Sequence, residues 1–379
     1  MKSWLGMQQF LEVTEPGFGQ KLCRAPLVGL SKIYQAAGRC REKAYRLGFR
    51  PTAKLPCRVI CVGNLTVGGT GKTPTVDLVC RTLLESGERV GIISRGYGRR
   101  TSPAERSDIL VVSDGSKVCA SSRAAGDEPL MLARRLPEVP VLVGKSRYRA
   151  GQEALARFNL QTLVLDDGFQ HLQLSRDLNI LVLDGRKPFG NGYCLPAGSL
   201  RESPQALARA DLILLTRICS HEQREKAERE IRRYNSRAPV VIGCHQPKDL
   251  ISLQGDQILP LSAIEGKSVV ALCAIADPGA FAATLKALSA EVIEAAAFAD
   301  HHWYSAAELR QVNGRVAAGK SWGLVTTEKD AVRIQPGLLQ CPVWVLRIDM
   351  VLVDGKELWE EKLKDRGKNA AISSPTGWP

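Results

Sequence analysis

The 379-residue sequence lacks several features that would place it in other classes of protein. None of its apolar runs approaches the roughly 18 residues that a membrane-spanning helix needs. Its first residues lack the apolar segment of a secretory signal peptide, which predicts a cytosolic chain. Its eleven cysteines include no C-x-x-C pair, so neither a zinc site nor a disulfide framework is indicated. A hydrophobic content of 44% is sufficient for a globular core.

Acidic residues are scarce at the N-terminal end, where most of the excess positive charge lies. The net charge is +13, and residues 1–58 contain 11 Lys or Arg against 3 Glu, a local surplus of +8. Apolar residues recur in this region at steps of three and four, with basic residues beside them, which predicts a basic amphipathic helix. The apolar stripe consists of Leu27, Leu30, Tyr34, Ala37, Cys40, Ala44 and Leu47.

Two interpretations of this basic helix remain open. It can lie on a membrane surface with its cations on anionic lipid, and Trp4, Leu5, Met7 and Phe10 would then add a second anchor. Alternatively, it can pack on its own domain with a solvated basic face. We expect no nucleic-acid partner, because no aromatic-rich platform accompanies the charge. Nothing in the sequence indicates an obligate protein partner.

A glycine-rich stretch at residues 63–74, GNLTVGGTGKTP, follows an apolar run and precedes a helix-like segment. Strand, glycine-rich loop and helix in this order are the layout of a phosphate-binding P-loop, although Thr66 stands where the general pattern has glycine. Glycines allow backbone N–H groups to surround phosphate oxygens, lysine reaches the outer phosphates, and a threonine hydroxyl can bind Mg²⁺. The sequence therefore predicts a site for a nucleoside triphosphate, formed by Thr66, Val67, Gly68, Gly69, Thr70, Gly71, Lys72 and Thr73. The alternative is an ordinary glycine-rich turn.

Short apolar runs alternate with helical patterns along most of the chain, as in parallel strands covered on both faces. This predicts an α/β fold: a doubly wound, mostly parallel P-loop sheet with a smaller second α/β lobe and the basic helical segment at the N-terminal end. We expect membrane-interface helices over 1–57, the P-loop core over 58–250, the smaller lobe over 251–368 and a disordered tail over 369–379. Residues 247–266 read as turn-rich.

Several acids and bases follow these predicted elements. Asp166 and Asp167 stand at the end of an apolar run, where α/β sheets bind ligands, so one of them could hold Mg²⁺, although either could also cap the next turn. Asp127 precedes a helical run, and helix capping is its ordinary explanation. The adjacent pair His301 and His302 is too closely spaced to place both rings on one metal.

Seven motifs in order along residues 58–335 make the chain resemble the tetraacyldisaccharide 4′-kinases of lipid A biosynthesis. They are the glycine-rich stretch, SRGYGR at 94–99, GDEP at 126–129, DDGFQH at 166–171, FGNGYCLPAGSLRE at 189–202, FADHHWY at 298–304 and TTEKDAVR at 326–333. The resemblance implies a peripheral enzyme on the cytosolic face of the inner membrane. It would transfer the γ-phosphate of ATP, with Mg²⁺, to the 4′-hydroxyl of an acylated glucosamine disaccharide 1-phosphate.

The resemblance also assigns roles to individual positions. Asp127 and His301 would form a dyad that accepts the proton of the sugar hydroxyl, with Lys72 and Arg147 as further catalytic residues. Thr73, Asp166, Asp167 and Glu202 would bind the metal. The substrate or its phosphates would be contacted by Asn64, Arg95, Tyr97, His171 and Arg201. From the residue pattern alone, Arg147 and Arg201 could equally form surface ion pairs.

Two other classes of function remain as alternatives. A membrane-associated P-loop NTPase switch would use the same loop, but guanine recognition usually needs Asn/Thr-Lys-x-Asp, and residues 327–330 read Thr-Glu-Lys-Asp, with the lysine one place late. A nonenzymatic lipid-binding or nucleic-acid-binding module would leave the phosphate loop and strand-end acids unexplained.

Overall fold

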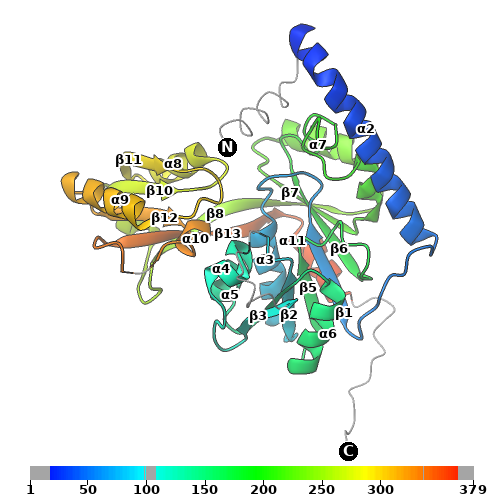
Figure 1. The fold of residues 1–379 in the computed structure, drawn as a ribbon, viewed down its shortest axis with the longest axis horizontal. Helices are drawn as coiled ribbons and strands as arrows, with labels where there is room; N and C mark the ends of the chain where they lie inside the picture. The colour runs from blue at the N-terminus through cyan, green and yellow to red at the C-terminus, as the bar shows by residue number, and fades with distance from the viewer. Residues whose placement is uncertain (1–17, 98, 100–107, 336, 366–379) are drawn as a thin grey trace, which may run out of the picture.

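The computed structural model describes residues 18–97, 99, 108–335 and 337–365, with side chains from residue 25 onward. The described chain forms two lobes around one continuous 13-stranded sheet (Figure 1). The strand order is β11-β10-β12-β13-β8-β7-β6-β1-β5-β2-β4-β3, with β9 paired to β8. The predicted α/β fold with a large, mostly parallel sheet is confirmed. The predicted anchor at residues 4–10 and the predicted tail at 369–379 lie outside the described residues.

The larger lobe is a parallel sheet with helices on both faces. Its parallel strands are β1 (Arg58–Gly63), β2 (Val90–Ser94), β4 (Pro140–Gly144), β5 (Thr162–Asp166), β6 (Leu178–Asp184) and β7 (Leu212–Thr216), with β3 (Ile109–Asp114) antiparallel at the edge. One face packs on α3 (Lys72–Glu85) and α5 (Asp127–Arg135), and the other on α6 (Arg147–Arg157) and α7 (His221–Arg232). The short helices are α4 (Ser122–Ala125) and η2 (Pro204–Arg209). Because both faces are covered, these strands are continuously apolar rather than alternating.

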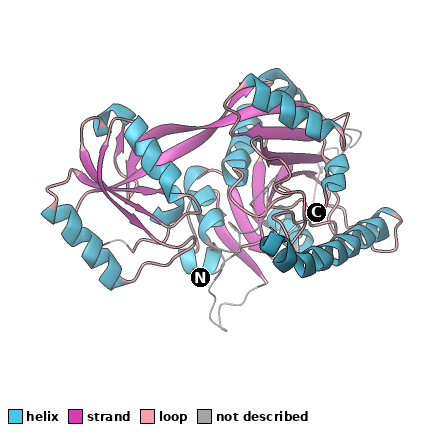
Figure 2. Ribbon diagram, turned by 90° about the horizontal axis from the view of Figure 1, so that it is seen from above, coloured by secondary structure: helices cyan, strands magenta, loops and turns pink. Residues whose placement is uncertain are grey.

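The smaller lobe repeats this construction with fewer strands (Figure 2). It contains β9 (Ile258–Leu259), β10 (Ser268–Cys273), β11 (Glu291–Ala297) and β12 (Gly323–Thr327). Its helices are η3 (Leu261–Ile264), α8 (Pro278–Ala287), α9 (Ala306–Ala318) and α10 (Glu328–Ala331). Helix α9 begins at a capping box in which Ser305 and Glu308 bind each other's backbone N–H groups, which explains why the chain turns into a helix there.

Two long strands, β8 (Val240–Ser252) and β13 (Val343–Asp354), join the lobes (Figure 1). They pair antiparallel from Trp344 opposite Ser252 to Asp354 opposite Ile242. The predicted turn from residue 247 is therefore wrong, because β8 continues to Ser252, and the predicted boundary at residue 250 falls inside this strand. Pro247 is tolerated because it sits opposite Ile348, where the register shifts and the regular hydrogen-bond ladder is interrupted.

The C-terminal helix α11 (Lys356–Lys364) packs on the larger lobe, although the sequence assigned this segment to the smaller one. Arg58 on β1 donates hydrogen bonds to the carbonyls of Leu363 and Lys362, which terminates α11 beside the first strand of the sheet. Trp359 is 1% exposed, and its Nε1 donates to Thr82 Oγ1 on α3 at 3.2 Å. Because β13 ends in the larger lobe, α11, which follows it directly in the chain, lies on that lobe as well.

Helix α2 (Phe18–Arg46) runs along one side of the larger lobe (Figure 1). It is held mainly by polar contacts, among them Ser31 Oγ to the Cys194 carbonyl at 2.8 Å and Arg41 Nη2 to the Gln170 carbonyl at 2.8 Å. Two of its large apolar side chains instead face outward, with Leu30 53% and Ile33 68% exposed, whereas Leu27 and Val28 are partly buried. No helix among the described residues has the length and apolar character to cross a membrane.

We predict that Trp359→Ala lowers the free energy of unfolding by about 3–5 kcal/mol, because it leaves a large cavity between α11 and α3. The matched control is Leu358→Ala, because Leu358 is 43% exposed on the same helix and its truncation should change stability by less than about 0.5 kcal/mol. Both are measured by urea denaturation. Equal effects of the two variants would contradict the placement of α11 in the core.

Candidate active site

The predicted phosphate loop connects β1 to α3, with Gly71 as the residue that caps the helix. Gly71 has φ +95°, and a Cβ there would lie 2.8 Å from Nε2 of His245 on β8, so both backbone and space require glycine. Gly68 also has positive φ, at +118°. The first N–H groups of α3 therefore point out of the loop at the end of the sheet, which is the geometry of an anion site.

Side chains of the surrounding elements stabilise the loop by hydrogen bonds. Asn64 is fully buried, and its Nδ2 donates to the Thr66 carbonyl at 2.7 Å and to Thr70 Oγ1 at 3.1 Å. Arg217, at the end of β7, donates to the Gly69 carbonyl at 2.7 Å. Asn64, which the resemblance assigned to substrate or phosphate, is thus placed as a support of the loop, and Arg217 is a support that the sequence reasoning missed.

Two strand-end carboxylates lie beside the loop in different environments. Asp166 is buried, and Ser94 Oγ donates to its Oδ2 at 3.0 Å. Burial, with the nearby charges of Glu128 and Asp167, raises the pKa of Asp166 to about 7. Asp167 instead accepts from Arg201 at 2.7 Å and lies 4.0 Å from Lys72 Nζ. Although burial opposes it, the charges of Lys72 and Arg201 lower the pKa of Asp167.

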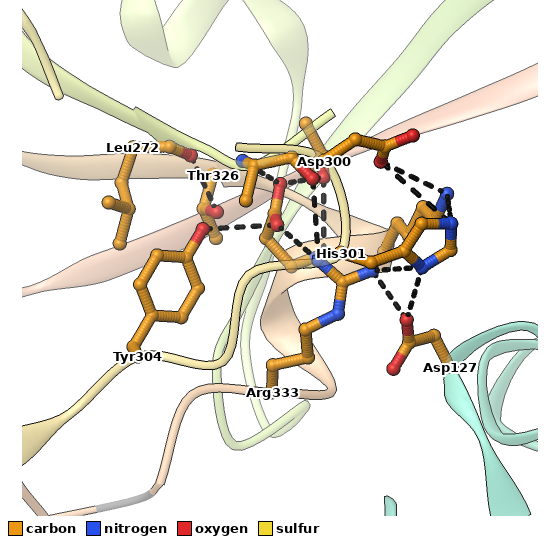
Figure 3. Close-up of polar contacts among 11 residues, drawn as sticks. Asp127, Leu272, Asp300, His301, Tyr304, Thr326 and Arg333 are labelled. Atoms are coloured by element: carbon orange, nitrogen blue, oxygen red, sulfur yellow. Dashed lines mark hydrogen bonds and ion pairs between the residues drawn. The ribbon is translucent and has the colours of Figure 1, made fainter. Parts of the chain in front are cut away.

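Asp127 and His301, 174 positions apart in the chain, are in hydrogen-bond contact (Figure 3). His301 Nδ1 lies 3.0 Å from Asp127 Oδ2. The alternative of helix capping does not hold, because Gly126 occupies the cap position and Asp127 is the first residue of α5. His301 has φ +62°, an uncommon conformation for a residue with a side chain, and such strain is often found at functional sites.

The sequence reasoning missed the charged residues that surround this pair. Arg333 donates a short hydrogen bond from Nη2 to Asp127 Oδ2, and its side chain has 0% exposure. Its Nη1 donates to Asp330 Oδ1 at 3.2 Å. Burial raises the pKa of Asp127, but the hydrogen bonds from His301 and Arg333 outweigh it, so the pKa is lowered. The only sequence feature that could have indicated these residues is the motif at 326–333, which includes Arg333. Its contact partner Asp127 is remote in sequence, so the motif alone does not reveal the contact.

The remaining predicted residues lie around the same cavity. Arg147 begins α6, is buried, and donates to the Lys145 carbonyl at 3.2 Å. Burial, with the positive charges of Arg147 and Arg176, lowers the pKa of His171 to about 4, so its ring is neutral at pH 7. Glu202 pairs with Arg209, and burial raises the pKa of Glu202. Tyr97 is 75% exposed, and its ring meets that of His301 edge-on at 6.2 Å.

A single cavity of about 2210 Å³ brings most of these groups together, with His301 in its lining and Asp127 in contact with His301 but not in the lining itself. Its lining includes residues 67–73 of the loop, both strand-end acids, Arg95, Arg147, His171, Arg201 and Glu202. The smaller lobe contributes Asp300, His301 and Lys329, and α2 contributes Tyr34 and Arg39. Within the described part of the chain, no group of three or more His, Cys, Asp or Glu side chains could hold a metal by itself. A cation here would need ligands from a bound phosphate, as Mg²⁺ commonly has.

A glycine loop between the first strand and helix of a doubly wound sheet, with a lysine and strand-end acids beside it, defines a P-loop kinase fold. The chain belongs to the tetraacyldisaccharide-1-P 4′-kinase family, whose model matches residues 23–368. The predicted family and its kinase activity in lipid A biosynthesis are therefore confirmed.

Curated relatives and a solved structure agree with this membership. The tetraacyldisaccharide 4′-kinase of Anaeromyxobacter dehalogenans is 42% identical over 353 residues, covering 92% of each chain. That of Geobacter metallireducens is 42% identical over 347 residues, covering 89% of this chain and 97% of the relative. The crystal structure of LpxK from Aquifex aeolicus, in complex with ATP, matches with a TM-score of 0.72 and 31% identity, over 90% of this chain and 98% of that one.

Proposed function

We propose that this chain transfers the γ-phosphate of ATP to the 4′-hydroxyl of an acylated glucosamine disaccharide 1-phosphate at the cytosolic face of the inner membrane. The observation that carries the proposal is the shared cavity, in which the phosphate loop and His301 face the same space. Its volume of about 2210 Å³ exceeds the roughly 300–1,000 Å³ of a typical small-molecule site, which leaves room for a nucleotide and a sugar together.

The phosphate loop would bind and orient the triphosphate. The N–H groups at the start of α3 and the ammonium of Lys72 are placed to compensate the phosphate charge, which develops further as the phosphoryl group is transferred. Lys72 Nζ lies 4.0 Å from Asp167 Oδ1, beside the loop. Arg147 and Arg201, which also line the cavity, would add positive charge, and Arg201 binds the same Asp167 carboxylate that Lys72 approaches.

The residues beside the loop fit a magnesium ion. Asp166 Oδ1 is buried and has no hydrogen-bond partner among the described residues, so one carboxylate oxygen is left for a ligand. Thr73, at the start of α3, is the hydroxyl that the motif assigns to the metal. Bound Mg²⁺ would neutralise charge on the outer phosphates. Asp167 and Glu202 are already engaged by arginines, so we assign Asp166 as the direct carboxylate ligand.

Asp127 and His301 would activate the sugar hydroxyl. The hydroxyl oxygen forms the new bond to phosphorus, the bond to the β-phosphate oxygen breaks to release ADP, and the hydroxyl proton passes to the Asp127–His301 pair. A lowered pKa makes the Asp127 carboxylate a weak base, but ensures that it is ionised at neutral pH. Its contribution is therefore mainly to orient the hydroxyl and to stabilise the proton as it leaves.

Helix α2 would bring the cavity to the membrane. Its polar contacts with the larger lobe leave Leu30 and Ile33 exposed, while Tyr34 and Arg39 line the cavity. A substrate with several acyl chains remains in the bilayer, so an apolar helix face next to the cavity is where its chains would emerge. This geometry favours membrane attachment over a helix that merely packs on its own domain.

The proposed transfer is tested with purified protein, ATP, Mg²⁺ and the acylated disaccharide 1-phosphate in mixed micelles, with the position of the new phosphate determined by mass spectrometry and NMR. We expect a 4′-phosphate with the wild-type chain and none with Lys72→Ala. GTP turnover that is stimulated by a protein and independent of the lipid would instead support the switch alternative.

We predict that Asp127→Ala and His301→Ala each lower kcat by about 10²- to 10³-fold, because each disrupts the pair that accepts the proton. The double variant should be little worse than either single one, because the two side chains act as a unit. The measurement is a double-mutant cycle of steady-state kinetics. Multiplicative losses would show that the two residues act independently.

We predict that Mg²⁺ binding weakens as the pH falls below about 7. The pKa of Asp166 is raised to about 7, so its carboxylate is free above that pH and protonated below it, and each further pH unit should weaken binding about tenfold. Isothermal titration with a non-hydrolysable ATP analogue measures the affinity. Asp166→Asn controls for titration of the phosphates themselves. An identical pH profile in that variant would exclude Asp166 as the titrating ligand.

We predict that Ile33→Asp weakens binding to vesicles of phosphatidylethanolamine and phosphatidylglycerol by about tenfold or more, because a charge replaces an apolar side chain at the interface. Ile258→Asp is the matched control, because Ile258 is similarly exposed, at 59%, on the smaller lobe. Co-sedimentation measures binding, and thermal melts check that both variants are folded. Equal binding of both variants would show that α2 is not the membrane contact.

A further inference from the structure

Charged side chains of the segment 328–333 contact several neighbouring elements. This segment comprises α10 and the two residues after it. Glu328 accepts from Arg135 Nη1 at 2.7 Å, and Lys329 Nζ lies 3.2 Å from His301 Nε2. Asp330, with no exposed surface, accepts from the Tyr304 hydroxyl at 3.0 Å and from the Ala274 N–H at 3.1 Å. The segment is thus anchored at both ends and cannot shift without breaking several buried contacts.

Lys329 determines which ring nitrogen of the His301 imidazole carries the proton. An ammonium group only donates hydrogen bonds, so Nε2 of His301 must accept from Lys329 and cannot itself carry a proton in this arrangement. The ring proton then lies on Nδ1, which donates to Asp127 Oδ2 at 3.0 Å. The opposite tautomer would place two lone pairs, those of Nδ1 and of the carboxylate, against each other.

Arg333 acts on the other side of the same hydrogen bond. Its Nη2 donates to the oxygen of Asp127 that accepts from His301, and lies 3.2 Å from His301 Nδ1. The 3.2 Å separation is that of two donors sharing one acceptor, so Arg333 fixes the position of the Asp127 oxygen, and Lys329 at Nε2 is the contact that selects the tautomer.

We propose that Lys329 is a positioning residue that fixes the Nδ1-protonated tautomer of His301 and thereby keeps its ring hydrogen-bonded to Asp127, whose accepting oxygen is held in place by Arg333, four residues further along the chain. The inference rests on the proposed function for its kinetic consequence, but not for its structural one. In the transfer reaction, this arrangement leaves Asp127 oriented before the sugar arrives, so no reorganisation is needed when the hydroxyl loses its proton.

Lys329 is the better residue to change, because its side chain is 25% exposed at the cavity and the carboxylate that it approaches at 3.6 Å, Asp300, is 36% exposed rather than buried. Removing Arg333 would leave both Asp127 and Asp330 without a cation, which threatens the fold. We therefore use Lys329→Met, which keeps the length of the chain, and Lys329→Arg, which keeps a donor. Lys286→Met, on the exposed surface of α8, is the matched control.

The first readout is the ¹⁵N spectrum of histidine-labelled, ligand-free protein with the imidazole in its neutral form, and His301→Asn identifies the His301 signals. We expect the wild type, Lys329→Arg and Lys286→Met to show a protonated Nδ1 and an unprotonated Nε2. Lys329→Met should show at least half of the protein with the proton on Nε2. A wild-type ring protonated on Nε2, or a Lys329→Met spectrum unchanged from the wild type, would overturn the inference.

The second readout is kinetic. Lys329→Met should lower kcat about tenfold or more and leave KM for ATP within about twofold, since the loss concerns the acceptor side of the reaction. Lys329→Arg should recover most of kcat. An equal loss in both Lys329 variants would contradict a positioning role that depends on a donor. The proposed role of His301 in the transfer fails separately if His301→Asn transfers phosphate at the wild-type rate, and the proposed function itself fails if the wild-type chain forms no 4′-phosphate; either result would leave the tautomer measurement valid.

Discussion

The candidate site depends on one buried ion pair that spans the two lobes. Arg333 has 0% side-chain exposure and binds Asp127 of the larger lobe and Asp330 of the smaller one. Breaking such a pair by removing one partner typically costs about 3–5 kcal/mol, because the other charge is left buried without compensation. The lobes must therefore meet in this register for the charges to be compensated. The same register places His301 against Asp127, so the contact proposed to activate the acceptor follows from a requirement of the fold.

A second buried cation connects this contact to the phosphate loop. Arg135 lies on α5, the helix that begins at Asp127, and pairs with Asp77 on α3, the helix that begins at the loop. It also pairs with Glu328 on α10 and Asp349 on the long strand β13. Burial lowers the pKa of Arg135, but these carboxylates outweigh it and raise the pKa, so the charge is retained. The nucleotide side and the acceptor side are thus held by one rigid network rather than by separate loops.

The carboxylates of Asp166 and Asp127 have different chemical properties because their surroundings differ. Burial and neighbouring negative charge raise the pKa of Asp166, whereas two hydrogen-bond donors lower the pKa of Asp127. A carboxylate with an unpartnered buried oxygen suits a cation, and a permanently ionised one that accepts from His301 and Arg333 suits the orientation of a hydroxyl. Surroundings that shift the pKa values of two carboxylates in opposite directions are a physical basis for assigning the two residues separate roles.

The sequence by itself determined the phosphate loop, the parallel strands before and after it, and the basic helix, because each is encoded by local spacing of glycine, apolar or charged residues. The resemblance of its motifs to those of the family implied that Asp127 and His301 share one site, which their local patterns alone did not indicate. Only the tertiary structure decided that β8 continues through Pro247 and that α11 returns to the larger lobe. The structure alone also selected Lys329 and Arg333 as the partners of His301 and Asp127. These outcomes depend on strand pairing and on contacts between residues far apart in the chain, and no local pattern carries that information.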